Sequence, residues 1–194
     1  MARFNSVSFP LRNKKVILVR AMTVQDANVY YEFIDQIALD STNTLQYIGR
    51  KRKTYNELDA QFTSDSLDNS TLNVGAFDQV KLVGQLRLRM PHSDHPWFQH
   101  LAQFGLMIIK DYWGQGIGKE LLAIQESFAR SIGITRIEAT VRSENERGIN
   151  LYKRAGYKIE GTRMQAARID GKYLDEYYIA KLLDCPNHLL DINT

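Results

Sequence analysis

Three glycines occupy alternate positions in the stretch Trp113-Gly114-Gln115-Gly116-Ile117-Gly118-Lys119. An apolar run precedes this stretch, and a pattern typical of an amphipathic helix follows it. A glycine-rich turn that enters a helix can direct several backbone N–H groups, and the positive end of the helix dipole, toward one place. A phosphate or pyrophosphate group binds well in such a place. The spacing therefore predicts an anion site, with a tight strand-to-helix turn without a ligand as the alternative.

Two better known phosphate loops do not fit this spacing. A Walker A loop needs glycine where Trp113 stands and serine or threonine where Glu120 stands. The dinucleotide-binding fingerprint needs a third glycine at the position of Lys119. Both fingerprints are therefore excluded, although a nucleotide-binding protein of another fold stays an alternative.

The segment from Gly105 to Tyr157 resembles the GNAT superfamily of acetyl-CoA-dependent N-acetyltransferases. Its first part, Gly105 to Leu122, is similar to the strand and pyrophosphate loop of that family. Its second part, Asn145-x(6)-Tyr152-x(3)-Gly156-Tyr157, is similar to the family helix that flanks the thioester. One difference is Trp113, because the family loop usually begins with glutamine or arginine. The final hairpin, residues 168–178, is similar to that of ribosomal-protein N-terminal and polyamine acetyltransferases.

The resemblance implies that acetyl-CoA is the co-substrate and that no metal takes part. The residues it assigns to the cofactor lie on the strand, on the loop and at the start of the second helix. They are Leu106, Met107, Ile108, Trp113, Gly114, Gln115, Gly116, Ile117, Gly118, Lys119 and Asn145. A backbone N–H near Met107 or Ile108 would stabilise an oxyanion by resemblance. Asn145 is equally explained as a residue that begins a helix.

Acetyl transfer to an alkyl amine needs two proton transfers. The ammonium form, with a pKa of about 10, must lose a proton before attack, and the departing thiolate gains from a proton donor. Tyr152 stands where the family has its tyrosine and is the expected acid, with a space-filling core tyrosine as the alternative. Glu138 is the expected base, although the closest N-terminal acetyltransferase pattern would place its glutamate at Thr140. The alternative for Glu138 is an exposed or ion-paired strand residue, with water as the base.

Three of the four histidines, His92, His95 and His100, lie close together before the apolar run. Their spacing lacks the helix or cysteine pair of common zinc sites. The prolines and polar residues between them indicate an irregular loop. The sequence therefore predicts surface histidines and no metal.

Local patterns predict the first elements of the fold. A continuous apolar run at residues 16–19 predicts a first strand that is covered on both faces. Thr23 with Asp26, and Thr54 with Glu57, form patterns typical of capping boxes. Two helices are therefore expected to begin there, joined by a polar loop.

The remaining elements place the two motifs on adjoining strands and helices. Alternation at residues 72–76 and 82–90 predicts two antiparallel strands. Ser143 with Glu146 predicts a capping box for the second motif helix, and Asp170-Gly171 predicts a tight final hairpin. The resulting order, β-α-α-β-β-β-α-β-α-β-β, matches the GNAT family. The resemblance implies an α/β fold with a mixed sheet whose central strands splay and which helices flank.

The composition fits a single acetyltransferase domain over residues 1–194. Hydrophobic residues make up 44% of the chain and charged residues 24%, so a substantial core can form. The net charge of +3 gives no strong sign of a nucleic-acid or membrane partner. The one cysteine, Cys185, cannot form an internal disulfide, and no apolar run suits a signal peptide or a transmembrane helix. A cytoplasmic location is the resulting prediction.

The acceptor is expected to be a primary amine, on a protein N-terminus or on a small molecule such as a polyamine or an amino sugar. A non-catalytic acyl-CoA-binding sensor is the alternative function, because it would keep the glycine loop and lose the acid or the base. Exposed strand edges in the last hairpin are compatible with a homodimer.

Overall fold

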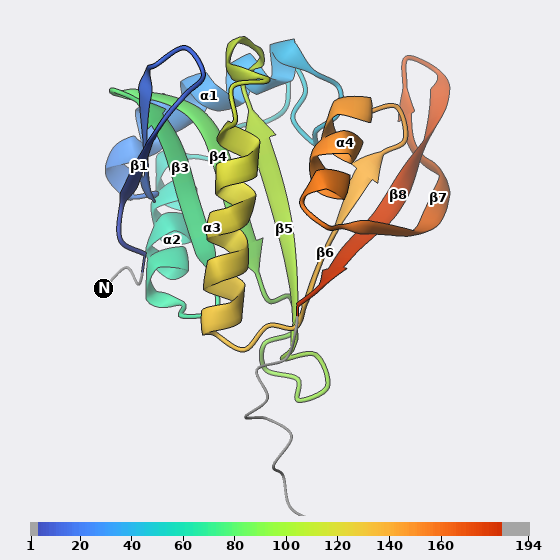
Figure 1. Ribbon diagram of the computed structural model, residues 1–194. Coiled ribbons are helices and arrows are strands. Elements are labelled where there is room, and N and C mark those ends of the chain that lie inside the picture. The colour runs from blue at the N-terminus through green and yellow to red at the C-terminus, as the bar shows by residue number, and fades with distance from the viewer. Residues whose placement is uncertain (1–3, 184–194) are drawn as a thin grey trace, which may run out of the picture. The chain divides into compact units, whose positions relative to one another are not determined.

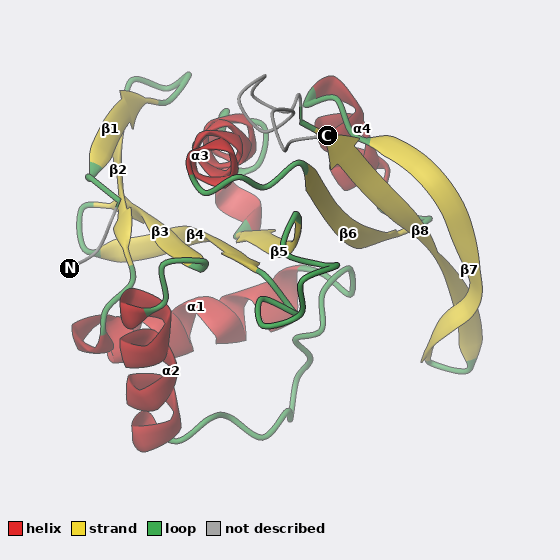
Figure 2. Ribbon diagram, turned by 90° about the horizontal axis from the view of Figure 1, so that it is seen from below, coloured by secondary structure: helices red, strands yellow, loops and turns green. Residues whose placement is uncertain are grey.

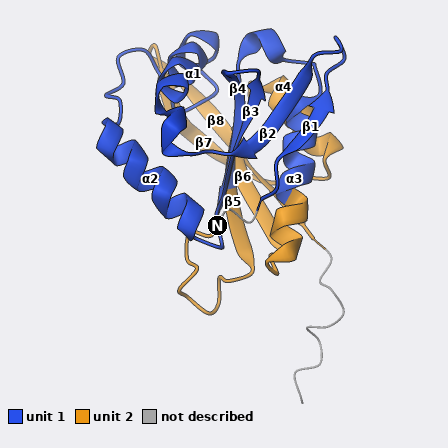
Figure 3. Ribbon diagram, turned by 90° about the vertical axis from the view of Figure 1, so that its left-hand side faces the viewer, with its two compact units in different colours: residues 1–89, 104–125 blue, residues 90–103, 126–194 orange. Residues whose placement is uncertain are grey.

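The computed structural model describes residues 4–183, which form eight strands, four α-helices and two short 3-10 helices. Figure 1 shows these elements, and Figure 3 shows the two compact units into which they divide. Residues 1–89 and 104–125 make up unit 1, and residues 90–103 and 126–194 make up unit 2. The mixed α/β class predicted from the sequence is confirmed. A single domain over residues 1–194 stays a prediction, and Cys185 lies outside the described residues.

Unit 1 is built on an antiparallel meander that carries helices on both faces. Its strands are β1 (Val7–Pro10), β2 (Val16–Ala21), β3 (Leu72–Asp78) and β4 (Lys81–Arg89), each paired with the next. Its helices are α1 (Ala27–Asp40), α2 (Tyr55–Leu67) and the first part of α3 (Ile117–Ser131). Figure 2 shows α1 and α2 on one face of these strands and α3 on the other. The strands β3 and β4 are buried along nearly their whole length, as the central part of a two-sided core requires.

The first two strands differ from the sequence prediction. Strand β1 was not predicted, and it pairs with β2 in register from Val7↔Val19 to Pro10↔Val16. The prediction that residues 16–19 are buried on both faces of the strand is wrong. Ile17 and Val19 are fully buried, but Val16 is 59% exposed. Although all four residues are apolar, they alternate between the two faces of β2. One face packs on the core and the other is exposed to solvent.

Both predicted capping boxes at the first two helices are confirmed. Asp26 accepts hydrogen bonds from the backbone N–H of Thr23 at 2.9 Å and from two guanidinium nitrogens of Arg20 at 2.8 and 2.6 Å. Burial alone would raise the pKa of Asp26, but these hydrogen bonds lower it overall. A 3-10 turn, Val24–Asp26, separates this cap from α1. At α2, the N–H of Thr54 donates to Glu57 Oε2 at 2.6 Å, and the N–H of Glu57 donates back to Thr54 Oγ1 at 3.3 Å.

A buried polar network fixes α2 to the meander. Asp65, on the inner face of α2, accepts hydrogen bonds from Asn73 Nδ2 at 2.7 Å and from Arg87 Nε and Nη2 at 2.9 and 2.6 Å. Gln85 Nε2 in turn donates to Asn73 Oδ1 at 2.9 Å. The carboxylate of Asp65 is compensated by one positive charge and by three hydrogen bonds from two side chains, which is the condition under which a buried charge is tolerated.

Unit 2 contains the first residues of β5 (Leu101–Ile108) and the last residues of α3. Its other elements are β6 (Arg136–Arg142), α4 (Glu146–Arg154), β7 (Lys158–Ile169) and β8 (Lys172–Leu182). Strand β5 runs parallel to β6 from Leu101↔Arg136 to Gln103↔Glu138, and β8 is antiparallel to both β6 and β7. The predicted hairpin is confirmed, because Asp170 and Gly171 have φ values of 48° and 81° and connect β7 to β8.

The loop of residues 91–100 contains the three clustered histidines, and all three are exposed, as predicted. His95 contacts the rings of Trp97 and Phe98 at centroid distances of 5.5 and 5.1 Å. Within residues 4–183 there is no group of three or more histidine, cysteine or acidic side chains that could hold a metal ion. In the same range, no helix has the length and apolar character needed to cross a membrane. The cytoplasmic location and the homodimer stay predictions.

Candidate functional site

The glycine loop lies in unit 1, between the end of β5 and the start of α3. Gly114 and Gly116 have φ values of 72° and 103°, in the region that favours glycine, so any other residue there would be strained. A Cβ added at either glycine would meet no atom within 4 Å, so the backbone of the loop is open on that side. The carbonyl of Gly116 accepts hydrogen bonds from the N–H groups of Lys119 and Glu120 at 3.0 and 3.2 Å, and α3 therefore begins directly at the loop.

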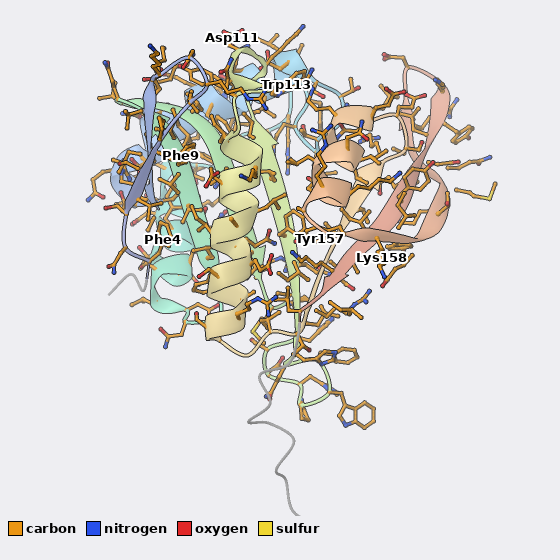
Figure 4. All side chains as sticks on the ribbon, in the orientation of Figure 1. Phe4, Phe9, Asp111, Trp113, Tyr157 and Lys158 are labelled. Carbon is orange, nitrogen blue, oxygen red and sulfur yellow. The ribbon has the colours of Figure 1, made fainter. Side chains whose placement is uncertain are left out.

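Trp113, the residue that differs from the usual family loop, turns back onto the strand. Its indole Nε1 donates a hydrogen bond to the carbonyl of Ile108 at 2.7 Å. Figure 4 labels Trp113 and Asp111 in this part of the chain. The indole thus stabilises the junction between β5 and the loop, and the backbone N–H of Trp113 donates to the carbonyl of Lys110 at 3.0 Å.

Further hydrogen bonds hold the entrance of the loop in place. The hydroxyl of Tyr112 donates to Asp78 at 2.5 Å, and the ammonium of Lys15 donates to the same carboxylate at 2.7 Å. The hydrogen bond from Lys15 is the main cause that lowers the pKa of Asp78. The backbone N–H of Lys110 donates to Asp40, the last residue of α1, at 2.6 Å. The loop is therefore tied to the β3–β4 turn and to α1, all within unit 1.

The side chains of the loop suit a polyanion. Lys119, in the first turn of α3, has an 83% exposed side chain and lies 3.9 Å from Glu120, too far for a strong ion pair. The Oε1 atom of Gln115 is buried, and the described part of the chain offers it no hydrogen-bond partner. An open backbone, a helix N-terminus and an exposed ammonium together fit the pyrophosphate of acetyl-CoA.

The second motif lies in unit 2, where Asn145 caps α4. Its Oδ1 accepts a hydrogen bond from the backbone N–H of Gly148 at 3.0 Å. The predicted capping box at Ser143 and Glu146 is therefore wrong, since α4 begins at Glu146 itself. The N–H of Ser143 is instead bonded to the carbonyl of Asp175 at 3.0 Å, which keeps Ser143 on the strand side of the turn.

The cap makes the outcome of Gly148→Ala predictable. In an ordinary exposed helix, this change stabilises by about 1 kcal/mol. Here a Cβ would stand 2.6 Å from Nδ2 of Asn145 and displace the cap, which is worth about 1 kcal/mol. Because these two effects nearly cancel, we expect Gly148→Ala to change the free energy of unfolding of the wild-type chain by much less than about 1 kcal/mol in urea titrations. In an Asn145→Ala background the same change should raise it, and a stabilising effect in both backgrounds would contradict the clash.

Tyr152, the predicted acid, is half-buried on α4. Its ring meets the ring of Tyr157 edge-on at a centroid distance of 5.9 Å, and its carbonyl accepts the N–H of Tyr157 at 3.0 Å. Burial raises the pKa of the Tyr152 hydroxyl to about 12. The hydroxyl therefore keeps its proton at neutral pH.

Glu138, the predicted base, lies on β6 at the last residue pair of the ladder with β5. It accepts hydrogen bonds from Gln103 Nε2 at 3.1 Å and from Arg136 Nε at 3.0 Å. Arg136 also donates to Glu160 at 3.0 and 2.5 Å, and the two carboxylates raise its pKa. Glu138 thus has the ion pair that the sequence analysis named as its structural alternative.

Arg142, at the end of β6, is a residue that sequence reasoning missed. It is only 9% exposed, and its Nη1 is buried without a hydrogen-bond partner in the described residues. Glu176 lies opposite it in the ladder, but the carboxylate of Glu176 bonds to Arg163 at 2.7 Å. The signal in the sequence was weak, because an arginine at a strand end is ordinarily exposed.

The predicted site residues therefore fall into two groups. Unit 1 holds Leu106, Met107, Ile108 and the loop from Trp113 to Lys119, while unit 2 holds Glu138, Asn145 and Tyr152. The loop group combines two glycines that have open space beside them with a helix N-terminus, and the other group combines a neutral phenol with an ion-paired carboxylate. The role of each residue stays a prediction.

Comparison with known proteins gives the class to which these features belong. The family model described as Acetyltransferase (GNAT) family matches residues 34–157. The chain belongs to this family, and the resemblance stated from the motifs is confirmed.

Individual relatives agree with this class. L-amino acid N-acetyltransferase AaaT of Escherichia coli (strain K12) is 30% identical over 105 residues, which are 52% of this chain and 62% of AaaT. The chain thus matches less than two thirds of this curated relative. A GNAT-family acetyltransferase from Streptococcus pneumoniae has a TM-score of 0.81 and 24% identity, over 87% of this chain and 99% of that one. The structure of yncA, a putative acetyltransferase from Salmonella typhimurium with acetyl-CoA, has a TM-score of 0.74 and 17% identity, over 87% and 94%.

Proposed function

We propose that the protein is an acetyl-CoA-dependent N-acetyltransferase that moves an acetyl group to a primary amine. The observation that carries the proposal is the open glycine loop at the N-terminus of α3, in a chain of the GNAT family. Its backbone amides and Lys119 would hold the pyrophosphate. The remaining cofactor contacts are assigned to Leu106, Met107 and Ile108 on β5 and to Asn145.

The chemistry assigned to the side chains is direct transfer while both substrates are bound. The nitrogen of the neutral amine attacks the carbonyl carbon of the thioester, and the bond between carbon and sulfur breaks. The hydroxyl of Tyr152, which is protonated at neutral pH, would give its proton to the departing thiolate. The proton lost by the amine would pass, directly or through water, to Glu138, which forms an ion pair with Arg136.

The acceptor is proposed to be the amine of a small molecule. AaaT, one of the curated relatives, is named for L-amino acids, and the final hairpin is similar to that of polyamine acetyltransferases. An amino acid and a polyamine differ in charge, so the residues around the acceptor decide between them.

A second candidate is a non-catalytic acyl-CoA sensor, which the ion pair of Glu138 favours. Calorimetric titration with acetyl-CoA, and with ATP and NAD as controls, tests the cofactor without any guess about the acceptor. We expect micromolar binding selective for acetyl-CoA, about 8 kcal/mol. Thiol release with a panel of amines then separates the candidates. Binding with turnover supports the enzyme, binding without turnover identifies the sensor, and equal binding of ATP or NAD contradicts both.

A further inference from the structure

Unit 1 contains a cavity of about 430 Å³ whose lining residues have no role in the reaction proposed above. One wall is the outer side of α1, from Tyr30 to Leu39, and the other is the segment from Gln46 to Lys53. This segment belongs to the connection between α1 and α2, which Figure 2 shows as a long loop. The volume falls within the range of small-molecule sites.

Specific contacts hold the two walls together. The hydroxyl of Tyr31 donates a hydrogen bond to the carbonyl of Lys53 at 3.0 Å. Arg52 forms an ion pair with Asp35 and lies over the ring of Tyr31, 5.9 Å from its centroid. The cavity is therefore a built feature of the fold rather than a gap beside a loose loop.

The cavity is basic on one side and apolar on the other. Four consecutive basic residues, Arg50 to Lys53, line it together with a single acidic residue, Asp35. Arg52 neutralises Asp35, whereas Arg50 donates to two uncharged oxygens, the carbonyl of Leu45 at 2.8 Å and Gln46 Oε1 at 3.0 Å. The opposite wall contains apolar residues of α1, namely Ile34, Ala38 and Leu39.

Tyr30 also lines the cavity and carries a polar hydroxyl. Its ring packs edge-on against Phe62 at a centroid distance of 5.5 Å. Burial raises the pKa of its hydroxyl, despite the nearby positive charges of Arg50 and Arg87. The carboxylate of Asp65, which forms an ion pair with Arg87, also raises this pKa. A neutral hydroxyl near Arg50 can donate a hydrogen bond to an anion.

The wall of the cavity is joined directly to the cofactor loop. Leu39 lines the cavity, and the next residue, Asp40, accepts the hydrogen bond from the backbone N–H of Lys110 at 2.6 Å. Lys110 begins the 3-10 turn that leads into Trp113 and the glycines. A ligand in the cavity would therefore lie beside the helix end that holds the loop.

We propose that this cavity binds the acidic group of the acceptor, so that the enzyme selects amines that carry a carboxylate or phosphate and an apolar body. The inference rests on the proposed function. An unneutralised Arg50 next to Lys51 attracts an acid and repels a polyamine, which would bring several positive charges into the same space.

Matched acceptors test this selectivity. Thiol release is measured for L-amino acids against their amides, for O-phosphoethanolamine against ethanolamine, and for spermidine. For each pair that the enzyme acetylates, we expect kcat/KM for the acid to be at least about tenfold higher than kcat/KM for its uncharged partner. The reason is the charge-assisted hydrogen bond that only the acid can accept. The carboxylate and phosphate pairs show which acid is preferred.

Arg50→Gln tests the residue, with Arg89→Gln as the matched control. Arg89 is an exposed arginine in the same unit and is the last residue of β4. We expect Arg50→Gln to raise KM for the acid about tenfold more than KM for its amide, with the affinity for acetyl-CoA retained. Arg89→Gln should change neither. Equal losses for acid and amide, or spermidine as the best acceptor, would overturn the proposal.

A binding measurement that needs no turnover tests the acid-binding cavity separately from the proposed acetyltransferase function. Saturation-transfer NMR of the same acids with the full-length chain reports on the cavity even if acetyl-CoA neither binds nor reacts, in which case the proposed function alone fails. We expect contact of the acids with the wild-type chain and a weaker signal with Arg50→Gln. If no acid binds, or if the amides bind as well, the cavity is not an acid-binding site.

Discussion

Gly116→Ala is expected to weaken acetyl-CoA binding at least about tenfold. The φ of Gly116 is 103°, where an alanine costs of order 1–3 kcal/mol, and relief of that strain must rotate the peptide groups of the loop. Because the added Cβ meets no atom within 4 Å, the effect cannot come from a simple clash with the protein. Calorimetric titration measures the dissociation constant of each variant.

Gly133→Ala is the matched control for backbone strain. Gly133 has a φ of 79°, a Cβ added there also meets open space, and it stands past the other end of α3. We expect both variants to lose stability in urea, and only Gly116→Ala to lose affinity for acetyl-CoA. If Gly116→Ala binds acetyl-CoA as tightly as the wild type, the loop is only a structural turn.

Tyr152→Phe is expected to lower kcat about 10²-fold while the affinity for acetyl-CoA is retained. The change removes one hydroxyl and leaves the ring that packs on Tyr157, so the loss isolates the proton donor. Stopped-flow or steady-state thiol release gives kcat, and calorimetry gives the dissociation constant. Tyr157→Phe, which alters the neighbouring ring in the same way, should have a much smaller effect on kcat. Comparable rates for Tyr152→Phe and the wild type would assign the tyrosine to packing.

The pH dependence gives the same hypothesis a second readout. The folded-state pKa of Tyr152 is raised to about 12 from an ordinary value of 10, so its neutral form is favoured by folding. The stability this contributes is complete below pH 10 and is lost as the pH rises toward about 12. We expect the unfolding free energy of the wild type to fall in this window more steeply than that of Tyr152→Phe. The rate should likewise show no descending limb from Tyr152 below about pH 11.

Much of the fold follows from local chemistry. Side chains within three residues of each other decide the caps at Thr23 and Thr54, and two residues with positive φ decide the Asp170-Gly171 hairpin. Such contacts are encoded along the chain, so the sequence alone predicts them. Burial of β2 could not be predicted in this way, because a neighbour far along the chain decides which face is covered.

The sequence by itself determined where the glycine loop lies and how its glycines are spaced. It also located the asparagine and the tyrosine of the second motif, Asn145 and Tyr152. The loop depends on positive φ at particular glycines, which is a property of the residue type. Only the tertiary structure decided that Trp113 bonds to Ile108, that Arg136 engages Glu138, and that the basic run from Arg50 faces α1. These contacts depend on which side chains the packing of distant segments brings within hydrogen-bond distance. The periodicity of residues along the chain does not predict such distances.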